Sequence, residues 1–595
     1  MKKRGWEQAD FVMVTGDAYV DHPSFGTAII SRVLEAYGYK VAILAQPDWK
    51  SCDDFRRFGK PRLGFFINSG NVDSMVNNFS VFKHRRKKDL YSPGGKTGRR
   101  PDRALTIYCN RAREAYKDVP IIIGGLEASL RRMGHYDYWS DKVRRSVLID
   151  SRADILIYGM GERATVQIAE ALDSGIDAKD IKWIKGTCVR GTEDDIDDET
   201  VILPAFEEIC ADRDKYGESF ALQYRNNDQI SGKRMAERYD KNLFVIQNIP
   251  QKILTTDEMD QVYELPYERD YHPCYEAEGG VPALSEVKFS ITGTRGCFGG
   301  CSFCALTYHQ GREVVSRSKD SIVREAEMLS RDRDFKGYIH DIGGPTANFR
   351  KPACRKQLKC GVCKDRDCMY PEPCPSMDID HTEYLEVLKA VRELPGIKKV
   401  FIRSGIRYDY LMADRRWQSF MKELCEHHVS GTLKVAPEHA SPNVLAKMRK
   451  PRAEVFERFS REYGKMNKKL GKKQYLIPYM ISSHPGSRLE DAVELALFLK
   501  KSGFIPDQVQ DFYPTPGTLA TCMYYTGRDP LTGEKVYVPR DMEEKKMQRA
   551  LMHFHKKENR GTVKKALERA GRTDLIDTLL GKGASKTAES KKRRK

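Results

Sequence analysis

The chain has 595 residues, of which 40% are hydrophobic and 31% are charged, and its formal net charge is +18. This length predicts roughly three or four folding units, and no segment approaches the ~20 consecutive apolar residues of a membrane helix. The basic start MKKRGWEQADFVMV leads into Thr15, Gly16 and Asp17 rather than into the apolar run of a secretory signal. We therefore expect a cytoplasmic protein with no membrane contact, whose 15 cysteines are reduced thiols or metal ligands.

Strand and helix signals alternate through residues 1–210. Helical segments separate short apolar strands, and several of the strands run into glycine turns. Such βαβ units predict a parallel sheet in a Rossmann-like domain, with its ligand edge at the glycine turns. The expected strands are FVMVTG (11–16), VAILAQ (41–46), LGFFIN (63–68), the start of PIIIGGLEAS (120–129) and the start of ADILIYGMGERATVQIAEAL (153–172).

The loop AYVDHPSFG follows the first of these strands. The domain resembles the cobalamin-binding type of Rossmann domain, in which the ligand histidine stands two residues after an aspartate and three before a glycine. Here His22 directly follows Asp21 and stands four residues before Gly26. We therefore expect a Rossmann-like domain that does not bind cobalamin.

The rest of the chain divides by pattern. A polar segment with little periodicity predicts a linker, and repeated strand–helix units then predict a partial (βα)6 barrel, followed by a helical end and a basic tail expected to be disordered. The expected strands of the barrel are KFSITG (288–293), GYIHDI (337–342), KVFIRS (399–404), TLKVAP (432–437), YLIPYM (475–480) and QVQDFY (508–513). The expected segments are 1–210, 211–283 (linker), 284–540 (core), 346–381 (cysteine-rich insertion within the core), 541–580 (helical extension) and 581–595 (tail).

Cys297, Cys301 and Cys304 form a C-x3-C-x2-C array within TGTRGCFGGCSFCALTYHQGR. Three thiolates hold three irons of a [4Fe–4S] cluster and leave the fourth iron open. This spacing resembles the radical SAM superfamily, in which the amine and carboxylate of S-adenosylmethionine chelate the open iron. In that superfamily the aromatic residue before the last cysteine, here Phe303, lies against the adenine. Structural zinc, with His309 as a fourth ligand, is the alternative.

Further candidates fall at the C-terminal ends of the expected barrel strands, where parallel barrels carry their chemistry. The resemblance implies that Gly343, Gly344 and Pro345 meet the amino group of S-adenosylmethionine. Candidate partners for its carboxylate or ribose hydroxyls are the side chains of Arg403, Ser404 and Glu438. His484 and Tyr513 are candidates for proton transfer or for positioning the substrate. For each of these residues a structural role, such as a turn, a surface charge or a helix cap, is the alternative.

A second group of five cysteines lies within about twenty residues of one another. A four-cysteine zinc knuckle and an auxiliary iron–sulfur cluster are equally consistent with their spacing. We call them the second cysteine group: Cys354, Cys360, Cys363, Cys368 and Cys374.

Taken together, these motifs are similar to those of the YgiQ family of radical SAM proteins, over most of the chain. The resemblance rests on DHPSFG, IIIGGLEASLRR, TRGCFGGCSFC, HDIGGPTAN, LKVAPEH and DFYPTPGT. It implies an enzyme that binds a [4Fe–4S] cluster, takes an electron from a flavodoxin- or ferredoxin-like reductant and cleaves S-adenosylmethionine to a 5′-deoxyadenosyl radical. It implies no substrate.

Three functional classes remain open. The first is modification of a macromolecule, with RNA favoured by the basic runs KHRRKK (83–88) and MNKKLGKK (466–473). The second is a radical reaction on a small molecule or a protein. The third is a metal-binding module without catalysis, which would bind iron but release no 5′-deoxyadenosine.

Overall fold

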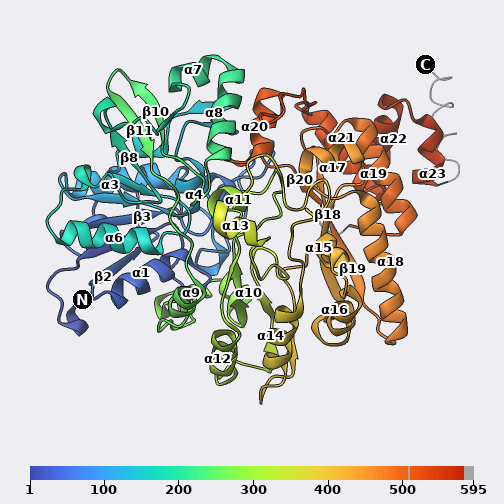
Figure 1. The fold of residues 1–595 in the computed structure, drawn as a ribbon, viewed down its shortest axis with the longest axis horizontal. Coiled ribbons are helices and arrows are strands. Elements are labelled where there is room, and N and C mark those ends of the chain that lie inside the picture. The colour runs from blue at the N-terminus through green and yellow to red at the C-terminus, as the bar shows by residue number, and fades with distance from the viewer. Residues whose placement is uncertain (507–508, 582–595) are drawn as a thin grey trace.

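The computed structural model describes residues 1–506 and 509–581 (Figure 1). Its N-terminal part is built on a nine-stranded sheet in the order β2-β1-β3-β4-β7-β8-β11-β10-β9. The strands from β2 to β7 run parallel to one another. The bounds are β1 (Phe11–Thr15), β2 (Val41–Ala45), β3 (Gly64–Asn68), β4 (Ile121–Ile123), β7 (Ile155–Ile157), β8 (Thr187–Gly191), β9 (Val201–Ile202), β10 (Met235–Asp240) and β11 (Leu243–Gln247).

Helices cover both faces of this sheet. Successive side chains of a strand point to opposite faces, and the strands are apolar at consecutive positions, so both faces must be buried. Val12 of β1 packs in one hydrophobic cluster with Leu105 of α3 (Ala104–Ala115). Its neighbour Phe11 packs in another cluster with Leu34 of α1 (Gly26–Ala36) and Ile168 of α6 (Glu162–Asp173). The domain is thus a doubly wound α/β sheet, as the apolar strands predict.

The segment 211–283, expected to be a linker, contributes secondary structure to this domain. It contains α8 (Arg213–Arg225), the antiparallel pair β10 and β11, and α9 (Thr256–Tyr263). Strand β11 pairs with β8 and so extends the sheet. The charged residues of β10 hide the strand from sequence analysis: Glu237 is fully buried, where its carboxylate accepts hydrogen bonds from the Tyr239 hydroxyl and the Gly134 N–H.

Each expected barrel strand coincides with a strand of the core. The second expected strand is divided into β15 and β16. Strand β16 pairs parallel with β12, the first expected strand, and β15 pairs parallel with β17, the third. The last three expected strands form the parallel sheet β18-β19-β20. Residue 508 of the sixth expected strand lies outside the described residues. The bounds are β12 (Ser290–Thr292), β15 (Tyr338–Ile339), β16 (Asp341–Gly343), β17 (Lys399–Val400), β18 (Thr432–Glu438), β19 (Tyr475–Ser482) and β20 (Val509–Asp511).

Amphipathic helices follow these strands and bury their apolar faces on them. One cluster joins Ile291, Val400 and Val435 of the strands to helix side chains such as Val387 and Phe459. The helices between the strands include α12 (Lys319–Ser330), α14 (Thr382–Arg392), α17 (Pro442–Met448), α18 (Ala453–Lys469) and α19 (Leu489–Ser502).

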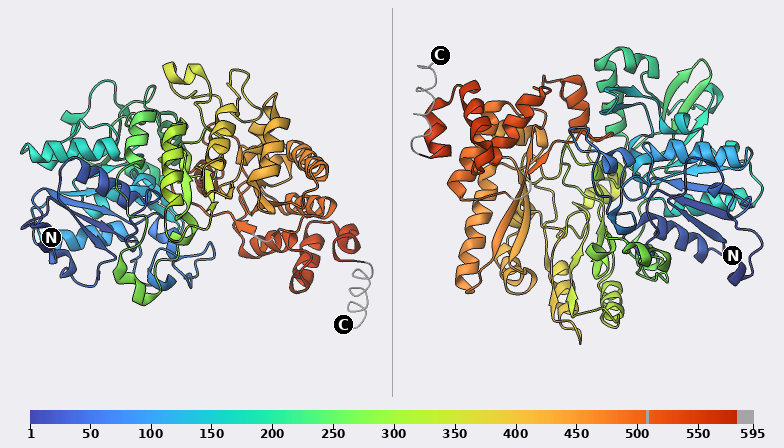
Figure 2. Two further views of the ribbon diagram at one scale, coloured as in Figure 1. Left: turned by 90° about the horizontal axis from the view of Figure 1, so that it is seen from below. Right: turned by 180° about the vertical axis from the view of Figure 1, so that it is seen from behind.

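The C-terminal region is helical and contacts both halves of the molecule (Figures 1 and 2). Helix α20 (Leu519–Thr526) reaches back to the N-terminal domain, where the rings of Tyr136 and Tyr525 stack with centroids 4.6 Å apart. The remaining helices are α21 (Met542–Met552), α22 (Arg560–Arg569) and α23 (Ile576–Leu580). Apart from Gly581, the predicted disordered tail lies outside the described residues. No described helix combines the length and apolarity that crossing a membrane requires.

Candidate functional site

The cysteine loop, residues 296–314, runs between strands β13 (Thr294–Arg295) and β14 (Val315–Ser316), which pair antiparallel. Gly296 has a φ of +82°, and a Cβ there would lie 1.7 Å from the Glu313 carbonyl oxygen. A Cβ on Gly299 would lie 2.3 Å from Nη1 of Arg407. Glycine is therefore required at position 296, where it lets the loop fold tightly around its thiols, and at position 299 it leaves room for the Arg407 side chain.

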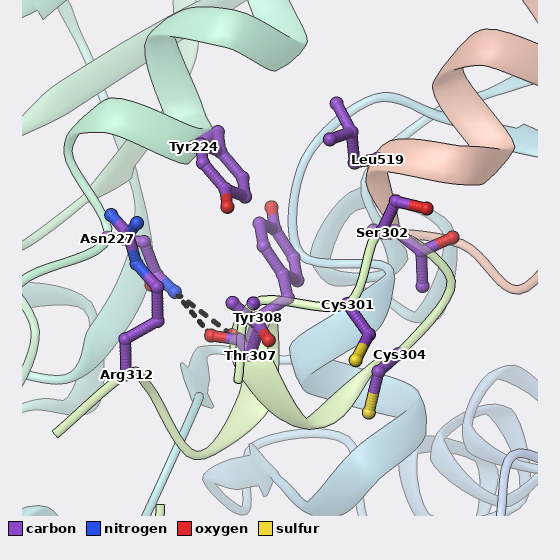
Figure 3. A pocket seen from close by; sticks show the side chains of 12 residues that line it. Tyr224, Asn227, Cys301, Ser302, Cys304, Thr307, Tyr308, Arg312 and Leu519 are labelled. Atoms are coloured by element: carbon purple, nitrogen blue, oxygen red, sulfur yellow. Dashed lines mark hydrogen bonds between the residues drawn. The ribbon is translucent and has the colours of Figure 1, made fainter. Parts of the chain in front are cut away.

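The loop brings Cys297, Cys301 and Cys304 into one electrostatic environment. Burial raises the pKa of the Cys304 thiol to about 12, with further contributions from Cys301 and Cys297. Burial, with a smaller contribution from Cys301, also raises the pKa of Cys297. The Cys304 N–H donates to the Cys301 carbonyl oxygen over 3.1 Å, and the two side chains point in the same direction (Figure 3). Three sulfur ligands are thus available from one loop.

Arg407 supplies a buried positive charge at these sulfurs and was not found from the sequence. Its Nη1 donates to Cys301 Sγ over 3.4 Å, and its Nε donates to Asp409 Oδ1 over 2.7 Å. Both side chains are buried. A cation beside three thiolates offsets their mutual repulsion, so Arg407 favours the deprotonated sulfurs that a metal requires.

This donor set fits an iron–sulfur cluster held by three cysteines. His309, the candidate fourth ligand of zinc, instead places Nδ1 2.9 Å from Oγ of Ser129 in the N-terminal domain. Within residues 1–506 and 509–581, no three Cys, His, Asp or Glu side chains are grouped as ligands of a single ion.

Residues of the cysteine loop, including Cys301 and Cys304, line a small pocket together with Tyr224 and Asn227 of the segment 211–283 (Figure 3). The Asn227 side chain donates to the carbonyl oxygens of Thr307 and Tyr308 over 3.2 and 3.4 Å. The Tyr308 hydroxyl donates to Gln223 over 2.6 Å. These bonds hold the loop against the N-terminal domain.

The five rim residues Gly343, Gly344, Pro345, Arg403 and Ser404 line one cavity of about 660 Å³, which we call the interdomain cavity. The glycines pack closely: a Cβ on Gly343 would lie 2.1 Å from the Ser404 hydroxyl oxygen. The arrangement leaves backbone atoms free to approach a ligand.

Asp341, which lines the same cavity, organises this rim and was missed by sequence analysis. Its Oδ1 accepts hydrogen bonds from the backbone N–H groups of Arg403 and Ser404 over 2.8 and 3.2 Å. Burial raises the pKa of its carboxyl group. The aspartate stands two residues before Gly343 in HDIGGP, and this position was the signal available in the sequence.

The opposite wall of the interdomain cavity belongs to the N-terminal domain. It consists of loops at the C-terminal edge of the parallel strands, including Ser24, Gly70, Asn71, Gly125 and Met160. The ligand edge of the first sheet and the rim of the core therefore face the same space.

Two contacts between the domains lie beside the cysteines. Arg295 Nη1 and Glu162 Oε1 form an ion pair of 2.5 Å, and Arg295 Nε donates to the Tyr263 hydroxyl over 3.1 Å. His309 contacts Ser129, as described above. Arg295 and His309 both line the interdomain cavity. They lie on either side of the cysteine motif in sequence, so both ends of the motif contact the N-terminal domain.

Phe303, which belongs to the cysteine loop, and Glu438, which lies near it, are not among the described residues that line the interdomain cavity. Glu438 is buried at a φ of +69°, 3.9 Å from Nζ of Lys450, and burial raises its pKa. Its charge acts on Cys304. The Phe303 ring lies 6.0 Å from that of His484, between centroids.

His484 and Tyr513 are not among the described residues that line the interdomain cavity, and their role in proton transfer or in positioning the substrate stays a prediction. His484 is fully buried; its Nδ1 lies 2.7 Å from the Pro485 carbonyl oxygen and its Nε2 3.3 Å from the Ser302 hydroxyl. Since the carbonyl only accepts, Nδ1 carries the proton and Nε2 accepts from Ser302. The Tyr513 hydroxyl donates to the Phe79 carbonyl oxygen over 3.0 Å. The contacts of His484 support the cysteine loop, and that of Tyr513 joins the core to the N-terminal domain.

The second cysteine group packs beside the first. Cys368 and Cys297 border the same hydrophobic cluster, in which the rings of Phe298 and Phe349 stack with centroids 3.7 Å apart. Burial raises the pKa of Cys368 to about 12, Arg312 opposes the rise, and Cys354 and Cys363 add to it. Cys374 N–H donates to the Cys368 carbonyl oxygen over 2.8 Å.

His22, which the cobalamin comparison singles out, is fully buried. Its Nδ1 accepts a hydrogen bond from the Ser24 N–H over 3.1 Å, and burial lowers its pKa to about 3. The neighbouring Asp21 pairs with Arg32. The expectation that this domain does not bind cobalamin stays a prediction.

Comparison with known families agrees with the motifs. A family described as "Radical SAM N-terminal" matches residues 1–290, the "Radical SAM superfamily" matches 291–499, and a domain of unknown function (DUF3362) matches 507–583. Among solved structures, the chain is similar to the radical S-adenosylmethionine methyltransferase TsrM from Kitasatospora setae with cobalamin and a [4Fe–4S] cluster bound. The TM-score is 0.49 at 13% identity, over 94% of this chain and 100% of that one. It is also similar to the cobalamin-dependent S-adenosylmethionine radical enzyme OxsB, with a TM-score of 0.49 at 10% identity over 99% and 75% of the two chains.

Closer relatives extend over almost the whole chain. A UPF0313 protein of Clostridium perfringens strain 13 is 59% identical over 577 residues, covering 97% of this chain and 87% of that protein. A UPF0313 protein of Clostridium botulinum strain ATCC 19397 is 56% identical over 578 residues, covering 97% and 89%. The chain therefore belongs to the UPF0313 family, the YgiQ family of radical SAM proteins.

Proposed function

We propose that the protein is an enzyme that binds a [4Fe–4S] cluster through Cys297, Cys301 and Cys304 and cleaves S-adenosylmethionine reductively. Held there, the cluster would supply one electron, taken from a flavodoxin- or ferredoxin-like reductant, for cleavage of S-adenosylmethionine to methionine and a 5′-deoxyadenosyl radical. The observation that carries this proposal is the interdomain cavity, which joins the rim residues to Thr294 and Arg295 at the start of the cysteine loop.

Different residues of the chain would bind different parts of S-adenosylmethionine and of the cluster. The absence of side chains at Gly343 and Gly344 leaves backbone groups for the methionine amine. Arg403, half exposed on the rim with its Nη2 3.8 Å from Glu286 Oε2, would exchange this exposed ion pair for one with the methionine carboxylate. Arg407 offsets the negative charge of the cysteines. His484 acts here as a positioning residue through Ser302.

Electron paramagnetic resonance of the anaerobically reconstituted, reduced protein tests this binding. We expect an iron–sulfur signal that changes when S-adenosylmethionine is added. The variant with Cys297, Cys301 and Cys304 changed to alanine should lack the response. A wild-type signal that is unaffected by S-adenosylmethionine would argue against the proposal.

RNA remains the macromolecular substrate that charge favours. All six side chains of the loop 83–88 are exposed, and Arg85 pairs with Asp102 over 2.7 Å. The other cationic residues of this loop make no ion pair with a described residue, and such a loop attracts phosphates in a salt-dependent manner. Binding to tRNA or rRNA that weakens steeply with salt supports this class, and no binding near physiological salt removes it.

A small substrate is the alternative, and a volume of about 660 Å³ falls within the usual range of small-molecule sites. For the second cysteine group we propose a second metal, either an auxiliary iron–sulfur cluster or zinc, whose binding would draw together side chains that are not grouped as ligands of a single ion in the described structure.

A further inference from the structure

A second, mostly apolar cavity of about 150 Å³ lies inside the N-terminal domain. We call it the ring pocket. It sits at the C-terminal edge of the parallel strands, between the sheet and the starts of α1 and α6. Its apolar walls come from side chains on strands, on helices and on the turn before α6: Met13, Ile29, Ile30, Phe66, Ile67, Ile157 and Met160.

The topology of the sheet places this pocket where doubly wound domains bind ligands. Strand β1 lies between β2 and β3, so the strand order runs to one side of β1 with β2 and to the other side with β3 and β4. The strand order therefore reverses between β1 and β3. Crevices at the carboxyl ends of strands beside such a switch point are the general ligand sites of open α/β sheets. Here the pocket is lined by Met13 of β1, by Phe66 and Ile67 of β3, and by the glycine turn at Gly124 and Gly125.

The size and polarity of the pocket indicate its ligand. A dry apolar cavity of about 150 Å³ is large enough to take up an aromatic ring the size of benzene. Two polar atoms at the wall, Glu162 Oε2 and Arg295 Nη2, are buried and have no hydrogen-bond partner among the described residues. They suit a heteroatom or a polar substituent on such a ring.

The ring pocket and the interdomain cavity are neighbours. They share lining residues from both domains, including Gly26, Asn71, Arg295 and His309. Arg295 and His309 bracket the cysteine motif in sequence. A ligand seated in the ring pocket therefore touches the two residues that tie the cysteine loop to the N-terminal domain.

We propose that the N-terminal domain binds its own organic ligand, with an uncharged aromatic or heteroaromatic ring in the ring pocket and a polar remainder in the interdomain cavity. The ring pocket contains none of the rim residues that would bind S-adenosylmethionine, and binding of the ring there does not require the iron–sulfur cluster.

Two substitutions fill the pocket without straining the backbone. Gly124 has φ −158°, which any residue adopts, and the nearest atoms to a Cβ there belong to Ile157 at 3.8 Å. Gly26 has open space within 4 Å of its Cβ position at the pocket mouth. Gly124→Leu and Gly26→Leu therefore place apolar atoms where the ring would sit. Gly464→Leu, on α18 and also with open space, is the matched control.

The test is titration of the full-length protein with indole, a neutral bicyclic probe, by isothermal calorimetry and saturation-transfer NMR. We expect one saturable site in the wild type and in Gly464→Leu, and binding at least about tenfold weaker in Gly124→Leu and Gly26→Leu, a difference of about 1.4 kcal/mol. The variant lacking Cys297, Cys301 and Cys304 should bind indole as the wild type does. This arm separates the inference from the proposed function.

Two results would overturn the inference. One is the absence of saturable indole binding to the wild type. The other is equal binding by the wild type and both pocket variants, with thermal unfolding showing that the variants are folded.

Discussion

Replacement of Arg407 by methionine tests how the protein holds three negatively charged sulfurs. Arg407 is buried between Cys301, 3.4 Å from its Nη1, and Asp409, 2.7 Å from its Nε. The variant removes one cation and leaves two potential anions in the same buried place. We expect losses of both stability and cluster content.

The structure separates the two losses. Removing one partner of a buried ion pair costs about 3–5 kcal/mol, whereas removing both is often close to neutral. The double variant Arg407→Met/Asp409→Asn should therefore recover most of the stability. It still lacks the cation at Cys301, where two unit charges at 3.4 Å attract by about 5 kcal/mol at an effective dielectric constant of about 20. Its cluster content should stay low.

The assay combines urea unfolding of the metal-free protein with iron and sulfide content after anaerobic reconstitution. Arg333→Met is the control, because its side chain is 89% exposed and surface ion pairs contribute about 0–1 kcal/mol. Recovery of both stability and iron in the double variant would refute the reasoning, since Arg407 would then act only through its pair with Asp409. Full iron content in the single variant would refute it as well.

Three further predictions concern pH, the rim and the second cysteine group. Burial lowers the pKa of His484 to about 3, so between pH 6.5 and about 3 the unfolded chain binds a proton that the folded chain does not. The free energy of unfolding should therefore fall on acidification by up to about 1.4 kcal/mol per pH unit because of this residue. In the His484→Gln variant the midpoint of urea unfolding should depend less on pH than in the wild type. Equal pH dependence of the midpoint in the two proteins would contradict the assignment. Gly343→Ala places a Cβ 2.1 Å from the Ser404 hydroxyl oxygen and should weaken binding of S-adenosylmethionine by about tenfold or more. Gly464→Ala should leave it unchanged, and equal affinity of both variants would show that the rim does not bind the methionine end. The variant lacking Cys297, Cys301 and Cys304 should retain metal on the second cysteine group, with iron and zinc analysis deciding between a cluster and a zinc knuckle. A metal-free protein would remove both assignments.

Strand positions were predictable because apolar runs mark them, and the rim followed from the strands. The C-terminal ends of parallel strands meet at one edge, so Gly343 and Arg403, sixty residues apart in sequence, line one cavity. The strand β10 was missed because a glutamate in the sequence indicates an exposed position. Glu237 is nevertheless buried, and its carboxylate accepts a hydrogen bond from the Tyr239 hydroxyl.

Side-chain direction was not predictable from strand ends. His484 follows Ser483, whose φ of +59° turns the chain, and the imidazole then points to Ser302 instead of the interdomain cavity. Arg407 and Arg295 escaped detection for another reason. Their partners Cys301 and Glu162 lie 106 and 133 residues away in sequence, and a periodicity signal carries no information on such pairs.

Release of 5′-deoxyadenosine from the reconstituted protein with reductant and S-adenosylmethionine tests the central claim most directly. The account predicts release by the wild type and none by the variant in which Cys297, Cys301 and Cys304 are alanine. No release from a wild-type protein that carries its cluster and binds S-adenosylmethionine, with candidate RNA and small-molecule substrates supplied, would contradict it and would favour a metal-binding module without catalysis.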